Sequence, residues 1–154
     1  MITFPDIMLG ISLLFLFLLF NIELGFYTLL ISHITLSLPF AVVTIFSGFS
    51  GLNKTIIEVG KDLGASDYEI LKKIIIPAVS SNIIASFLIS FTLSLDDVLV
   101  SYFVSGPQYE VLPLTIFSLA RSGIKPEVNA ICTLMLVISI FFIFLSQILL
   151  RRHD

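Results

Sequence analysis

Residues 54–77 of the chain are KTIIEVGKDLGASDYEILKKIIIP, a polar stretch with four acids, four bases and apolar runs on both sides. Gly64 can supply the left-handed conformation that closes a helix at its C-terminus. Ser66 and Glu69 have the S-x-x-E spacing of a capping box, which opens a new helix. The stretch therefore predicts two short helices, 55–63 and 68–76, with a sharp turn between them and the second ending before Pro77.

The composition of the whole chain places it in a membrane. It is 57% hydrophobic and only 12% charged, and its mean hydropathy is +1.10. A soluble protein of 154 residues needs more polar surface than this, so lipid is an expected partner. The net charge of −3 comes without a basic tract, which argues against nucleic acid, and the single cysteine excludes an intramolecular disulfide.

The apolar runs predict an all-α bundle that forms one domain over residues 1–154. Four spans are expected, at about 4–22, 24–49, 78–104 and 128–150. The first run is the shortest, because its strictly apolar part, 7–22, gives only about 24 Å as a helix. Between the spans lie the polar loop 50–77 and a segment 105–127, in which residues 112–120 predict a short helix at the interface or re-entering the bundle.

The basic residues predict the orientation of these spans. Four spans put both termini on one side, and bases are enriched on the cytoplasmic side of membrane proteins. Six bases accompany the polar stretch and the C-terminus, and two lie on the other side: Lys54, Lys61, Lys72, Lys73, Arg151 and Arg152 against Arg121 and Lys125. Residues 50–77 and both termini are therefore expected in the cytoplasm.

Two interpretations of residues 54–77 remain open on composition alone. The two helices can rest on lipid headgroups, as amphipathic helices do, or they can form a docking surface for another protein. Their residue pattern resembles the EAA loop of ABC importer permeases, and this favours docking. The matching residues are Glu58, Gly64, Ala65, Ser66, Ile74 and Pro77, while Val59, Gly60 and Ile76 depart from the usual pattern.

The resemblance implies a fold and a set of partners. The fold would be that of type I (MetI-like) importer permeases, and the loop would couple the chain to cytoplasmic ATP-binding subunits. A second permease subunit and an external binding protein would complete the transporter. ATP would be bound by the partner subunit, so the chain itself is expected to have no cofactor and no catalytic residue. In agreement, the sequence lacks the G-x-x-x-x-G-K-[ST] phosphate loop and any cluster of metal ligands.

Other stretches are similar to the permeases of spermidine/putrescine ABC importers, which belong to the bacterial inner membrane. They are residues 62–66, 93–98, 105–114 and 126–130. Such permeases have six spans and the similarity covers the last four, so the first two are expected to be lacking. Two alternatives stay open: a permease for another small solute, and a truncated membrane remnant that does not transport.

The third predicted span carries a polar stripe that is a candidate substrate path. At about 100° per residue, six polar side chains share one arc of a continuous helix: Asn82, Ser86, Ser90, Ser94, Asp97 and Ser101. Serines in such a stripe are more often packing contacts. An ionised Asp97 near the bilayer centre costs at least about 2.5 kcal/mol unless it is paired, and a polyamine would supply the matching positive charge. We therefore expect Asp97, supported by Asp96, Ser94 and Ser90, to contribute to the path.

One further intramembrane residue stands out. His33 lies in the second predicted span. The sequence supplies no partner that would indicate a metal site or a proton relay, so His33 is expected to be hydrogen-bonded inside the bundle.

Overall fold

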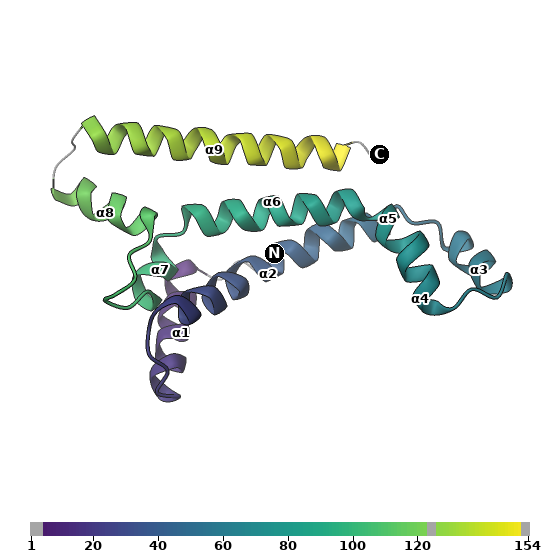
Figure 1. Cartoon of the computed structure of the whole chain (residues 1–154), viewed down its shortest axis with the longest axis horizontal. Coiled ribbons are helices and arrows are strands. Elements are labelled where there is room, and N and C mark those ends of the chain that lie inside the picture. The colour runs from purple at the N-terminus through teal and green to yellow at the C-terminus, as the bar shows by residue number, and fades with distance from the viewer. Residues whose placement is uncertain (1–4, 123–125, 152–154) are drawn as a thin grey trace.

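Three long helices lie side by side in the computed structural model, which describes residues 5–122 and 126–151. They are α2 (Phe26–Ser50), α6 (Ser80–Asp96) and α9 (Pro126–Arg151). Helix α6 packs against α2 on one side and α9 on the other, as Figure 1 shows. The described regular structure is entirely helical, as predicted.

The helix lengths support a membrane protein. Within the described residues, α2 and the part Val128–Ile148 of α9 are long and apolar enough to cross a bilayer. A third crossing is available if two bent halves, Asp67–Ala78 and Ser80–Asp96, count as one span. Helix α1 (Asp6–Leu19) is apolar but shorter. The predicted start of the first span at residue 4 lies outside the described part, as do Lys125 and Arg152.

The polar stretch forms the predicted pair of helices with a turn. Helix α3 (Lys54–Asp62) ends in a Schellman motif: the Ala65 N–H donates to the Gly60 carbonyl at 3.1 Å and the Gly64 N–H to the Lys61 carbonyl at 2.9 Å. Gly64 has the φ of +82° that this motif requires. Helix α4 (Asp67–Ile70) then opens with the predicted capping box between Ser66 and Glu69. The helical pair projects from one end of the bundle (Figure 1).

The prediction that the second short helix stops before Pro77 is wrong. After α4 the chain continues as a π-helical segment, η1 (Leu71–Ile75), and as α5 (Ile76–Ala78), which includes Pro77. Proline has no N–H and its ring excludes the carbonyl four residues earlier, so the wider π turn accommodates it. The direction of the chain changes after α5, where the axes before and after Val79 differ by 65°.

The predicted third span, 78–104, is not the one continuous helix that the polar stripe had assumed. Helix α6 ends at Asp96, Asp97 is extended at φ −70° and ψ 123°, and a separate short helix, α7 (Leu99–Val104), follows. Aspartate is a poor residue for a helix interior because its short polar side chain competes for backbone groups. The predicted helix at 112–120 is confirmed as α8 (Leu112–Ser122).

The buried core lies where α1, α2 and α7 meet. It consists of Phe17, Leu29, Val100 and Val104. Gly10 permits the close approach of α1 to α7, since a Cβ there would lie 3.2 Å from the Val100 Cα. Helix α1 accordingly packs more extensively on α7 than on α2.

Side-chain hydrogen bonds join α2 to α6. The Asn82 amide nitrogen donates to the Thr44 carbonyl at 3.1 Å and to Ser47 Oγ at 3.2 Å. The Asn82 side chain lies directly on Gly48, where a Cβ would come within 2.7 Å of it. Gly48 therefore makes room for the hydrogen bonds that hold the two helices together.

We predict that Gly48→Leu destabilises the protein by roughly 1–3 kcal/mol, because the larger side chain displaces Asn82. Gly51→Leu is the matched control, since the nearest atom to a Cβ there is a carbonyl oxygen 3.9 Å away. Thermal unfolding of the purified variants in one detergent measures the difference. Equal melting temperatures for the two variants would contradict this account of the α2–α6 contact.

Candidate functional site

The break between α6 and α7 is held together by the Asp97 carboxylate. Its Oδ1 accepts the Val100 N–H at 3.2 Å, and its Oδ2 accepts the Ser101 N–H and the Ser101 hydroxyl, both at 2.8 Å. The carboxylate thus serves the free backbone donors at the start of α7, in the manner of a helix cap. These bonds offset the cost of burying the charge. From the sequence, only pairing with a passing cation had been expected to offset it.

His33 on α2 faces this carboxylate across the helix contact. Its Nδ1 lies 2.7 Å from Ser94 Oγ, and its Nε2 lies 2.9 Å from Ser101 Oγ and 3.4 Å from Asp97 Oδ2. The prediction that His33 is hydrogen-bonded within the bundle is confirmed. The sequence supplied no partner for His33, whereas the structure places the Asp97 carboxylate within ion-pair distance of it.

The hydrogen bonds of this cluster can be assigned a direction, from donor to acceptor. The single hydroxyl hydrogen of Ser101 donates to Asp97, so Ser101 Oγ accepts the hydrogen on His33 Nε2. In the neutral ring, Nδ1 is then the acceptor and receives the hydroxyl of Ser94. A neutral His33 with hydrogen on Nε2 satisfies every polar atom of the cluster.

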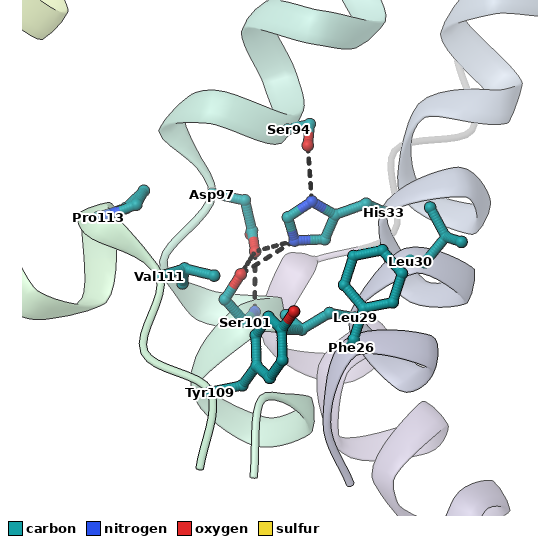
Figure 2. A pocket seen from close by; sticks show the side chains of 10 residues that line it. All are labelled: Phe26, Leu29, Leu30, His33, Ser94, Asp97, Ser101, Tyr109, Val111 and Pro113. Atoms are coloured by element: carbon teal, nitrogen blue, oxygen red, sulfur yellow. Dashed lines mark hydrogen bonds and ion pairs between the residues drawn. The ribbon is translucent and has the colours of Figure 1, made fainter. Parts of the chain in front are cut away.

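The cluster opens onto a hollow of about 320 Å³. Figure 2 shows His33, Asp97 and Ser101 at its centre, with the rings of Phe26 and Tyr109 on one side. These two rings are 5.7 Å apart between centroids. The remaining lining is mostly apolar: Leu29, Leu30, Val111 and Pro113. One acidic group in an apolar, aromatic hollow is suited to an alkylammonium group, through charge pairing and the electron-rich ring faces.

Two of the predicted path residues, Asp96 and Ser90, lie apart from this cluster. Asp96 points to α9, where it accepts the hydroxyl of Ser139 at 3.0 and 3.1 Å, and it lines a different hollow. Ser90 is half-buried on α6 and makes no hydrogen bond to His33 or Asp97 in the described structure. Ser101 bonds to Asp97 across the α6–α7 break, and Ser94 bonds to His33, so the two serines do not form one helical stripe with Asp97. The stripe ends because α6 ends at Asp96.

The residues predicted to couple the chain to an ATPase gather on the α3–α4 pair. Gly64, Ala65 and Ser66 form its turn, and Glu58 lies on an exposed face of α3. Pro77, in contrast, lies beyond η1 near the bend. Gly60 allows α3 to pack closely against α4 and η1, since a Cβ there would meet Ile74 at 3.3 Å and Ile70 at 3.6 Å.

The tip of this pair is exposed, and hydrogen bonds link the side chains that follow the turn. Leu63 is 82% and Tyr68 is 68% exposed, so the turn presents apolar surface. Glu69 accepts a hydrogen bond from Lys73 at 3.0 Å, and this bond, followed by those from Ser66, lowers the Glu69 pKa to about 2. The Glu69 carboxylate of the capping box therefore stays ionised near neutral pH.

Sequence reasoning did not assign His33 or Phe26 to the substrate path. An intramembrane histidine was the available signal, because ionisable residues inside a membrane generally mark functional sites. Its partner could not be found, since the residues lie on different helices. No group of three or more metal-ligating side chains occurs among residues 5–122 and 126–151.

Comparisons with known proteins agree on one group. Residues 1–154 match the family described as "Binding-protein-dependent transport system inner membrane component". The chain is 52% identical over 147 residues to the spermidine/putrescine transport system permease protein PotC of Escherichia coli, covering 96% of this chain and 56% of that protein.

Two further relatives extend the pattern. The PotC protein of Haemophilus influenzae is 50% identical over 150 residues, which are 97% of this chain and 58% of the relative. The Escherichia coli putrescine transport system permease protein PotI is 37% identical over 141 residues, 88% of this chain and 50% of the relative. The chain thus spans little more than half the length of these relatives.

We predict that Asp97→Ala is about 1–2 kcal/mol less stable than Asp97→Asn, because only the asparagine keeps an oxygen that can accept the N–H groups of α7. Thermal unfolding in one detergent gives the stability difference, and hydrogen exchange at the Val100 and Ser101 amides locates it. Equal stability with equal exchange would show that Asp97 does not cap α7.

Proposed function

The chain belongs to the family of binding-protein-dependent transport system inner membrane components, a family of multi-pass membrane proteins, and we propose that it acts as a permease subunit of an ABC importer for polyamines. The observation that carries the cargo class is the identity of 50–52%, over nearly the whole chain, to permeases named for spermidine and putrescine transport. PotI, which is 37% identical, is also named for putrescine transport.

The hollow beside Asp97 supports this cargo class. A carboxylate has about four acceptor positions, and among the described contacts Asp97 Oδ1 receives only the Val100 N–H. Oδ1 can therefore accept a second donor without losing the α7 cap. We propose that an ammonium group of the passing polyamine pairs with Asp97 while its methylene chain contacts Phe26 and Tyr109. Ser94, which lines the same hollow, would contribute there, whereas Asp96, which lines a different hollow, and Ser90 would contribute at other points of the path.

The α3–α4 pair is the proposed attachment point for the ATP-binding subunits, and this favours docking over resting on lipid headgroups. Its exposed apolar tip, with Leu63 and Tyr68, resembles a surface that another protein covers rather than a solvated loop. The Schellman motif and the capping box give this tip a fixed shape that can transmit movement. We propose that ATP is bound and hydrolysed by those subunits, so that this chain needs no cofactor.

Further partners follow from the exposed apolar surface. The chain exposes 10977 Å², whereas a compact soluble protein of this mass exposes about 7,800 Å². We propose that lipid and a second permease subunit cover the apolar helices, and that an external polyamine-binding protein delivers the cargo. The C-terminal end of α9 lies toward the α3–α4 end of the bundle in Figure 1, which supports placing both in the cytoplasm.

We predict that Asp97→Asn lowers uptake of labelled putrescine about tenfold or more. The loss of one charge-assisted hydrogen bond is worth about 1.5–3 kcal/mol, and 1.4 kcal/mol corresponds to a factor of ten. The substitution is made at the native locus, and uptake is divided by the amount of chain in the membrane. Co-purification of the ATP-binding subunit should be retained, and wild-type uptake by the variant would remove Asp97 from the path.

We predict that Gly64→Val uncouples ATP hydrolysis from uptake, because a side chain in the left-handed region costs about 1–2 kcal/mol and opens the turn. Gly64→Asn is the matched control, as asparagine tolerates this conformation, and no atom lies within 4 Å of a Cβ there. Glu58→Gln tests the exposed face of α3 in the same way. The readout is putrescine taken up per ATP hydrolysed by the assembled importer in proteoliposomes. Normal ratios for both Gly64→Val and Glu58→Gln would leave the docking proposal without support.

A further inference from the structure

We propose that His33 is a proton-controlled competitor for Asp97: when protonated it pairs with the carboxylate and lowers its occupancy by a cation, and when neutral it leaves the carboxylate available. The proposal rests on the proposed function, since it concerns the regulation of the same site. It gives His33 a positioning role, because His33 acts on the cation through Asp97.

The geometry brings the imidazole to the carboxylate without any rearrangement. His33 Nε2 is 3.4 Å from Asp97 Oδ2 and 2.9 Å from the Ser101 hydroxyl, which itself donates to the same Oδ2 at 2.8 Å. The carboxylate is almost entirely buried and the imidazole is mostly so. Little water separates the two groups, so a charge on the ring acts strongly on Asp97.

Both protonation states of His33 fit the same side-chain positions. In the neutral state Ser94 donates to Nδ1, and in the protonated state Nδ1–H donates to Ser94 Oγ, at the same 2.7 Å separation. Only the Ser94 hydroxyl hydrogen has to rotate. A proton can therefore be gained or lost at Nδ1 while the heavy atoms of the cluster stay in place.

Few other ionisable groups face His33. Asp97 and Tyr109 are the other titratable side chains lining the hollow. Asp96, on the neighbouring α6, is bonded to Ser139 on α9, and Glu110 lines a separate hollow with Tyr102 and Arg121. Asp6 on α1 makes no ion pair or hydrogen bond with His33 in the described structure. The charge of the site is therefore set chiefly by His33 and Asp97 together.

The consequence is a competition between a proton and the cargo. With His33 neutral, the pair carries one negative charge and attracts an ammonium group. With His33 protonated, the pair is neutral overall and a cation entering the hollow meets the imidazolium charge. Cation occupancy should therefore fall as the pH falls. By thermodynamic reciprocity, a bound cation would oppose protonation of His33 by the same factor.

The test is the pH profile of labelled putrescine uptake between pH 5.5 and 8 in cells that carry each variant at the native locus, with uptake divided by membrane abundance. For the wild type we expect uptake to fall about fivefold or more toward low pH, the usual range for coupled sites. His33→Gln can still donate to Ser101 but cannot be protonated, so its uptake should be flat across the range. His33→Lys carries a permanent charge and should be poor at every pH. His153→Gln changes the only other histidine and should keep the wild-type profile.

The outcomes separate a proton-controlled role from a structural one. Equal losses in His33→Gln and His33→Lys, or a wild-type acid fall in His33→Gln, would overturn the proposal. If His33→Gln does not reach the membrane, His33→Asn replaces it: it also lacks an ionisable ring, so its uptake should lose the acid fall, and a retained fall overturns the proposal. Failure of the proposed function gives a different pattern, namely no putrescine uptake by the wild type or wild-type uptake by Asp97→Asn at every pH.

Discussion

A helix that breaks inside an apolar bundle leaves backbone N–H groups that no water can satisfy, and Asp97 supplies the acceptors for them. Its carboxylate binds the first free N–H groups of α7 and fixes the direction in which the chain leaves α6. The same break turns Ser101 toward His33. The hollow, its acidic group and the position of α7 therefore all depend on one buried carboxylate.

Polar side chains also hold the long helices together where the hydrophobic effect offers little. In lipid, apolar surface gains little from burial against another helix, so association relies on close packing and hydrogen bonds. Asn82 bonds α6 to α2 beside Gly48, and Ser139 bonds α9 to Asp96. Each contact lies between helices that are far apart in sequence. The two buried serines of α9, Ser139 and Ser146, thus both bond to α6.

The parts of the structure that the sequence predicted well are those fixed by local interactions. The turn at Gly64 and the capping box at Ser66 join residues within five positions of each other, so their spacing alone predicts them. The break at Asp97 is also local, but it was overlooked because the apolar run on both sides predicted a continuous helix. Pro77 was predicted to end the helix before it. In the structure the π turn before Pro77 allows the helix to continue through it.

The sequence by itself determined that this protein is helical, that it needs lipid, and that its polar stretch forms a helix, a turn and a second helix, because composition and short-range spacing control these properties. Only the tertiary structure decided that Asp97 meets His33 while Asp96 turns to α9. These pairings join residues more than forty positions apart, and they depend on how the helices pack and on where α6 ends. Helical periodicity is defined only within one helix, so it could not predict them.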